Sequence, residues 1–130
     1  MLLSLLSLLP VATAALTHDV RDALKPRNWD LRLLKPGCTA NSSNIDLSVY
    51  HASGIGARDC TTVDVNGSLV DSVSWKSPSE TSRYDLCMFT DSQCGAHAFD
   101  DVIRNGWQVC YVYSGWKGYK VVAAGESCVV

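Results

Sequence analysis

The residues that could carry out acid–base or nucleophilic chemistry are few and scattered along the chain. The 130-residue sequence has three histidines, His18, His51 and His97, and no serine lies in the Gly-x-Ser-x-Gly pattern of a serine hydrolase. His97 precedes Asp100 and Asp101 at the spacing of a dyad on one helix face, although a solvated helix face shows the same pattern. These residues do not predict an enzyme.

A small exported ribonuclease is the enzyme class that stays open. Such an enzyme needs only a carboxylate, one or two histidines and an arginine around a phosphate. His51, His97, Arg58, Arg104 and Glu126 supply these groups, but nothing in their spacing brings them together. We therefore expect no catalytic residues and no cofactor.

The cysteines predict disulfides and not a metal site. A zinc site needs close pairs such as Cys-x-x-Cys, which this chain does not contain. An even number of cysteines in a short exported chain indicates that all are paired, here as three bridges, while the sequence leaves the pairing open. The six residues are Cys38, Cys60, Cys87, Cys94, Cys110 and Cys128.

Residues 1–15 predict a signal peptide. Residues 2–9 are apolar except for Ser4 and Ser7, and Ala12-Thr13-Ala14-Ala15 offers small residues suited to cleavage. The apolar run is shorter than the about 20 residues of a transmembrane helix, so we expect no transmembrane segment. A buried N-terminal helix is the alternative. Export also fits the disulfides, which persist outside the cytoplasm, so we expect a secreted, extracellular protein.

The remaining chain predicts one β-rich domain. Residues 16–28 are polar and form a flexible arm or a short helix, and residues 29–130 form the domain. Segments 29–34, 45–50 and 84–89 share a pattern of alternating apolar residues and Asp-Leu, which places every second residue on a buried strand face. Further strands are expected at 62–65, 69–75, 107–113 and 119–124.

Local signals complete the predicted architecture. Asn66-Gly67 predicts a hairpin turn, and in strand 107–113 the residues Trp107, Val109, Tyr111 and Tyr113 should share a face. One short helix is expected over residues 96–105, with Gly106 as its cap. The pattern indicates a compact, disulfide-stapled antiparallel β-sandwich or barrel with this one helix.

Composition limits the classes of partner. The formal net charge of −2 argues against a nucleic-acid-binding protein with a broad basic face. The segment Gly-Trp-Lys-Gly-Tyr-Lys at 115–120 predicts an exposed turn that presents aromatic rings and lysines to a partner protein or glycan, although these rings could instead fill the core. The partner-binding candidates are Trp116, Lys117, Tyr119 and Lys120.

Two triplets match the acceptor pattern for N-glycosylation, at Asn41 and Asn66. Both lie in polar, turn-like surroundings where a glycan would be tolerated. They make the chain a candidate glycoprotein and say nothing about its activity.

The leader, the spaced cysteines and the stretches 72–78, 84–94, 106–110 and 115–119 resemble small cysteine-rich secreted proteins of filamentous fungi, many of which are candidate effectors involved in virulence. The strand pattern also loosely resembles the βγ-crystallin Greek key, but Asp100-Asp101-Val102-Ile103 continues with Arg104-Asn105, which departs from the calcium signature of those domains.

The resemblance implies a secreted, non-enzymatic binding protein that acts on a host or extracellular target. A small toxin or antimicrobial protein is the first alternative, although the chain lacks an amphipathic cationic helix. A carbohydrate-binding module or a ribonuclease-like hydrolase is the second.

Overall fold

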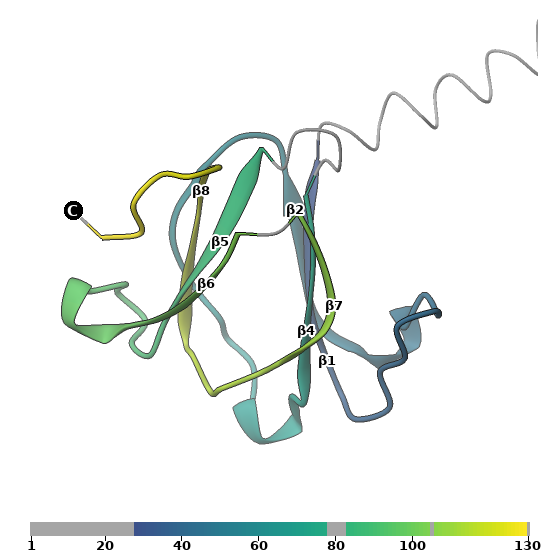
Figure 1. Ribbon diagram of the computed structural model, residues 1–130. Coiled ribbons are helices and arrows are strands. Elements are labelled where there is room, and N and C mark those ends of the chain that lie inside the picture. The colour runs from purple at the N-terminus through teal and green to yellow at the C-terminus, as the bar shows by residue number, and fades with distance from the viewer. Residues whose placement is uncertain (1–27, 78–82, 105, 130) are drawn as a thin grey trace, which may run out of the picture.

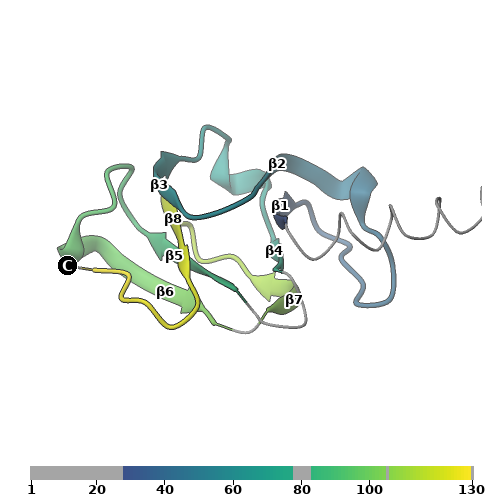
Figure 2. The ribbon, with the colours of Figure 1, turned by 90° about the horizontal axis from the view of Figure 1, so that it is seen from above.

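Two antiparallel sheets of four strands each stack face to face (Figure 1). The computed structural model describes residues 28–77, 83–104 and 106–129. The first sheet has the order β2-β1-β4-β7 and the second the order β3-β8-β5-β6, and the view from above separates them (Figure 2). The strands are β1 Trp29–Leu34, β2 Ser48–Gly54, β3 Arg58–Thr62, β4 Ser72–Lys76, β5 Tyr84–Phe89, β6 Phe99–Ile103, β7 Trp107–Val112 and β8 Gly118–Ala123. The sheets are open, so the mainly β prediction is confirmed as a sandwich and not as a barrel.

The two halves of the chain repeat one arrangement. In the first half β1 pairs with β2 and β4 while β3 lies in the opposite sheet, and in the second half β5 pairs with β6 and β8 while β7 lies in the opposite sheet. Each half is a Greek-key arrangement, because its fourth strand lies beside its first. Strands β1 and β5, two of the three similar sequence segments, are therefore equivalent.

The core lies between the sheets and follows the alternation predicted for β1 and β5. Trp29, Leu31 and Leu33 of β1 and Leu86 and Met88 of β5 are all buried. Burial of such side chains stabilises the fold by about 1.5–3 kcal/mol each relative to exposure. The rings of Trp29 and Trp75 stack with centroids 5.8 Å apart within this core.

The prediction of a helix over residues 96–105 is wrong, because most of this segment forms strand β6. A short 3-10 turn, η4 Ala96–Ala98, precedes β6. Cys87 pairs with Val102 and Leu86 with Ile103 across the β5–β6 ladder, and the rings of Phe89 and Phe99 meet edge to face at 5.7 Å. The apolar residues that match helical spacing are used instead in cross-strand pairs, because an available neighbouring strand overrides a weak local preference.

Two predictions in the first half also fail. Residues 45–47 form a 3-10 turn, η2 Ile45–Leu47, and Ile45 is exposed, so strand β2 begins only at Ser48. Strand β3 ends at Thr62, and Asn66-Gly67 leads into η3 Gly67–Leu69 and not into a hairpin. The reason is topological, because the strands on either side of this turn, β3 and β4, lie in opposite sheets.

Strand β7 contains a β-bulge that reverses its alternation. Trp75 pairs with Gln108 and Val73 with Tyr111, so β7 has one more residue than β4 over the same interval. Cys110 adopts a φ of 66° within this interval. Trp107 is therefore exposed while Tyr111 packs against the core, and the expectation that they share a face is wrong.

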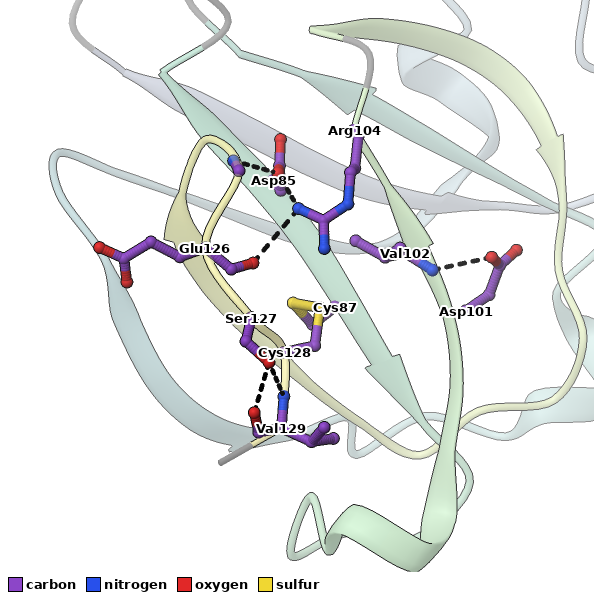
Figure 3. Close-up of a disulfide and its surroundings, with 10 residues drawn as sticks. Asp85, Cys87, Asp101, Val102, Arg104, Glu126, Ser127, Cys128 and Val129 are labelled. Atoms are coloured by element: carbon purple, nitrogen blue, oxygen red, sulfur yellow. Dashed lines mark hydrogen bonds and ion pairs between the residues drawn. A yellow bond between two sulfur atoms is a disulfide. The ribbon is translucent and has the colours of Figure 1, made fainter.

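Three disulfides confirm the predicted number and establish the pairing as Cys38–Cys110, Cys60–Cys94 and Cys87–Cys128. The first joins the loop after β1 to β7, the second joins β3 to the loop after β5, and the third joins β5 to the C-terminal segment (Figure 3). Each bridge closes a long loop, of 34 to 72 residues. In the chain-entropy description, such a bridge contributes about 4 kcal/mol to stability.

The predicted signal peptide and almost all of the predicted arm lie outside the described residues. Within 28–77, 83–104 and 106–129, no helix has the length and apolar character of a membrane span.

Candidate functional site

The segment 115–120 does not present its aromatic rings to solvent. Trp116 and Tyr119 are 0% exposed and belong to the core, so the expectation of a surface formed by these rings is wrong. Gly118 serves close packing and not an open turn, because a Cβ there would lie 2.6 Å from the Asp91 carbonyl oxygen. Lys117 is exposed, and Lys120 Nζ lies 5.4 Å from the ring centroid of Phe89.

A groove lies between strands β6 and β7. We call it the edge groove, because β6 and β7 are the edge strands of opposite sheets. It is a shallow groove with a volume of about 570 Å³. Its lining residues are Asp100, Asp101, Gln108, Val109, Cys110, Tyr111, Val112 and Ser114.

The free backbone edge of β7 forms one wall of the edge groove. Five consecutive residues, 108–112, line it, and side chains along a strand alternate between two faces. The bulge at Cys110 interrupts this alternation in β7, and because β7 is the outer strand of its sheet, its side facing away from β4 is not used by the ladder. An edge strand offers N–H and C=O groups that the ladder does not use.

Both carboxylates of the edge groove accept a hydrogen bond from a hydroxyl of the opposite wall. Tyr111 Oη donates to Asp101, and Ser114 Oγ donates to Asp100. The hydrogen bond to Asp101 is the main cause that raises the pKa of Tyr111 above its ordinary value, since it stabilises the protonated phenol. The first bond connects β6 to β7 and the second connects β6 to the segment after β7, so both carboxylates are held in place.

The edge groove has an acidic and hydrogen-bonding character. Its lining contains two carboxylates, one amide and two hydroxyls and has no basic side chain. Cys110 is bonded to Cys38 and offers no thiol. Such a lining can accept hydrogen bonds from an ammonium, a guanidinium or a hydroxyl group, and carboxylates favour the charged donors.

The opposite side of the sandwich, where β2 and β3 lie at the sheet edges, is bridged by side chains. Tyr50 Oη and Tyr119 Oη lie 2.9 Å apart, and the Arg58 guanidinium lies over the Trp29 ring at 4.6 Å. Burial is the first cause that raises the pKa of Tyr50, followed by its bond to Tyr119. The edge groove occupies the corresponding position of the second half, and there the side-chain bridges run from Tyr111 and Ser114 to the two carboxylates.

The residues considered for catalysis have separate partners in the structure. His97 Nε2 lies 3.9 Å from Asp91 and not beside Asp100 or Asp101. His51 bonds Asp30 at 2.6 Å on the first sheet.

Two further members of the ribonuclease-like set meet where the end of β6 lies beside the C-terminal segment. Arg104 binds the Asp85 carboxylate and the backbone oxygen of Glu126 (Figure 3). Among the described residues, no group of three or more His, Cys, Asp or Glu side chains could hold a metal ion.

The predicted glycosylation positions Asn41 and Asn66 are both exposed. Asn66 Oδ1 accepts hydrogen bonds from the Ser68 amide and hydroxyl within its turn. Whether either side chain carries a glycan stays a prediction.

Sequence reasoning considered Asp100 and Asp101 for a dyad and for calcium but missed Gln108, Tyr111 and Ser114. No local motif marks these three residues. They join the carboxylates only because β6 and β7 lie at neighbouring edges of different sheets, and the bulge at Cys110 sets which residues of β7 reach the groove.

Comparison with known proteins gives no relative from which a role could be transferred. No protein-family model, no curated protein and no solved structure matches the chain.

Proposed function

We propose that the protein is secreted and acts outside the producing cell as a non-enzymatic binding protein, whose edge groove takes up a basic segment of an extracellular or host partner protein. The lining of the groove is the observation that carries this proposal. It combines two carboxylates with the free edge of β7 and has no basic side chain. A lysine or arginine of an extended partner segment would complement both features.

The disulfides support the extracellular part of the proposal. All six cysteines are paired, which is compatible with an oxidising compartment. The bridge from Cys38 anchors Cys110 in the wall of the edge groove. A covalently anchored wall loses less conformational freedom when a partner binds, so more of the interaction energy is available as affinity.

The two Greek-key halves support the βγ-crystallin-like part of the resemblance, and the disulfides support its cysteine-rich secreted part. On this basis we propose an effector-type role. A membrane-active toxin is the competing class, and it would release dye from lipid vesicles, whereas a protein that acts through the edge groove would leave vesicles intact.

Calorimetric titration with charge-matched peptides tests the proposal. We expect an acetylated and amidated tri-lysine peptide to bind the oxidised protein and the corresponding tri-glutamate peptide not to bind. The double variant Asp100→Asn/Asp101→Asn should weaken tri-lysine binding about fivefold, because each solvent-accessible carboxylate contributes on the order of 0.5 kcal/mol.

The double variant Asp59→Asn/Asp64→Asn is the matched control, since it removes the same charge at exposed positions outside the edge groove. It should leave tri-lysine binding unchanged. Equal binding of both peptides, or an equal loss in both double variants, would contradict the proposal.

A further inference from the structure

A row of polar, charged and aromatic side chains crosses the outer face of the first sheet. The strand registers place Asp30 opposite both Ser53 of β2 and Lys76 of β4, and Lys76 opposite Trp107 of β7. With strands about 4.8 Å apart, the row extends over about 14 Å. We call Ser53, Asp30, Lys76 and Trp107 the cross-strand row.

An exposed indole ring ends the cross-strand row. Trp107 is 57% exposed, in contrast to the other three tryptophans of the chain, Trp29, Trp75 and Trp116, which are buried. Lys76 Nζ lies 5.0 Å from the centroid of the Trp107 ring. An exposed ring beside an ammonium group can stack on the apolar face of a sugar while the ammonium meets an acidic substituent of that sugar.

The charges of the cross-strand row favour an anion. Asp30 accepts a hydrogen bond from His51 at 2.6 Å and has an ion pair with Arg32 at 3.3 Å, so its charge is already compensated. Arg32 lies in the neighbouring row, opposite His51. Among the described residues Lys76 has no carboxylate partner. This part of the surface therefore has two cations, Arg32 and Lys76, and one carboxylate, Asp30, so it is basic, unlike the edge groove.

We propose that the cross-strand row binds an acidic polysaccharide, with a sugar ring stacked on Trp107 and a uronic carboxylate facing Lys76. The hydroxyl of Ser53 adds a hydrogen-bonding group at the far end of the row. A glycan is favoured over a nucleic acid because the net charge of the chain is −2 and the cationic surface is small. This site is independent of the edge groove.

Two oligosaccharides that differ only in charge test this assignment, namely hexamannuronate and the neutral mannohexaose of the same linkage. Because the other tryptophans are buried, quenching of the fluorescence by acrylamide reports chiefly on Trp107. We expect hexamannuronate to protect the emission from acrylamide and mannohexaose to protect it much less. By calorimetry, Trp107→Ala should weaken hexamannuronate binding about tenfold, and Lys76→Gln should weaken it about threefold.

Three controls separate this site from general electrostatics and from the edge groove. Lys117→Gln removes an exposed positive charge elsewhere and should leave the affinity for hexamannuronate unchanged. Asp101→Asn alters the edge groove and should also leave it unchanged. Thermal melting of each variant verifies that the fold is intact. Lys76→Arg keeps the positive charge and should therefore keep the affinity for hexamannuronate. The pair Lys76→Arg and Lys76→Gln thus tests the assignment even if Trp107→Ala alters the fold.

Several results would overturn the assignment. These are equal binding of the neutral hexasaccharide, an equal loss of affinity in Lys117→Gln and Lys76→Gln, or no binding of hexamannuronate to the wild-type protein. Tighter binding of a single-stranded DNA hexamer than of hexamannuronate would likewise overturn it, since the surface would then be a nucleic-acid site.

Discussion

Removal of the Arg104 side chain should destabilise the protein strongly, because it would leave a buried carboxylate without its cation. Asp85 is 1% exposed, and its Oδ2 atom accepts hydrogen bonds from Arg104 Nη1 at 2.6 Å and from the Gly125 amide at 2.8 Å (Figure 3). Its Oδ1 atom has no hydrogen-bond partner among the described residues. In the variant Arg104→Met, one amide hydrogen bond would remain for the whole buried charge.

The expected loss follows from this geometry. Breaking a buried ion pair from one side costs about 3–5 kcal/mol. Arg104 is 46% exposed, so water can approach the vacated position, and we expect the lower end of about 3 kcal/mol. This loss corresponds to a decrease in Tm of roughly 12–24 °C for a domain of this size.

A second variant separates the buried charge from the packing of the arginine. Asp85→Asn/Arg104→Met removes both charges, and the amide oxygen can still accept from the Gly125 amide. This double variant should lose only about 1 kcal/mol, so it should be more stable than Arg104→Met alone. Urea unfolding of the oxidised proteins measures these free energies, and Lys117→Met is a surface control that should change by at most about 0.5 kcal/mol.

Two outcomes would refute the reasoning about Asp85. One is an Arg104→Met variant that loses less than about 1 kcal/mol, which is the cost of an ordinary hydrogen bond. The other is a double variant no more stable than Arg104→Met, since the loss would then come from packing and not from an unpaired charge.

Three further predictions concern a core tryptophan, one disulfide and the hydroxyl of Tyr111. Trp116→Ala should lower stability by about 3–5 kcal/mol through the cavity it creates, and unchanged thermal melting would contradict the burial of that ring. Replacing Cys87 and Cys128 by alanine should lower the free energy of unfolding by about 4 kcal/mol. Peptide mapping of the wild-type protein without reduction should recover Cys87 linked only to Cys128. The pKa of Tyr111 is raised in the fold, so the native state holds the phenol proton more tightly than the unfolded state and stability should fall as pH rises above about 10. Tyr111→Phe should reduce this loss of stability at alkaline pH in melting experiments. An unchanged loss would contradict the role of Asp101 as hydrogen-bond acceptor.

The sequence was sufficient to predict the class of fold where apolar residues alternate along a strand. Trp29, Leu31 and Leu33 of β1 alternate in this way, and Leu86 and Met88 of β5 face the same core, although the other face of β5 is also buried. Six spaced cysteines likewise predicted three bridges. Each of these features depends on a local pattern or a simple count, and such features can be read from one chain.

The predictions that are wrong concern features that depend on contacts with segments far away in the chain. The apolar spacing after Ala96 is compatible with a helix, and only the neighbouring strand β5 makes Phe99–Ile103 a strand. Cys110 adopts a positive φ although it is not a glycine. The residue type at this position therefore gave no basis for predicting the bulge that exposes Trp107.

The candidate sites could not be predicted because each joins segments far apart in the chain. The edge groove requires β6 and β7 to belong to opposite sheets, and the cross-strand row requires the registers of four strands. The segment 115–120, whose second half belongs to β8, illustrates the reverse error. Its glycines and lysines resemble an exposed turn, yet Gly118 permits close packing and Trp116 fills the core.

The central claim is that the protein acts by binding through the edge groove, and an amide-resolved NMR titration tests it most directly. Tri-lysine peptide is added to the oxidised, ¹⁵N-labelled protein while the chemical shift of every backbone amide is followed. We predict that the largest changes occur at residues 100–101 and 108–114, with small changes at the remaining amides. Changes that cluster elsewhere, or no changes at saturating peptide, would contradict the claim.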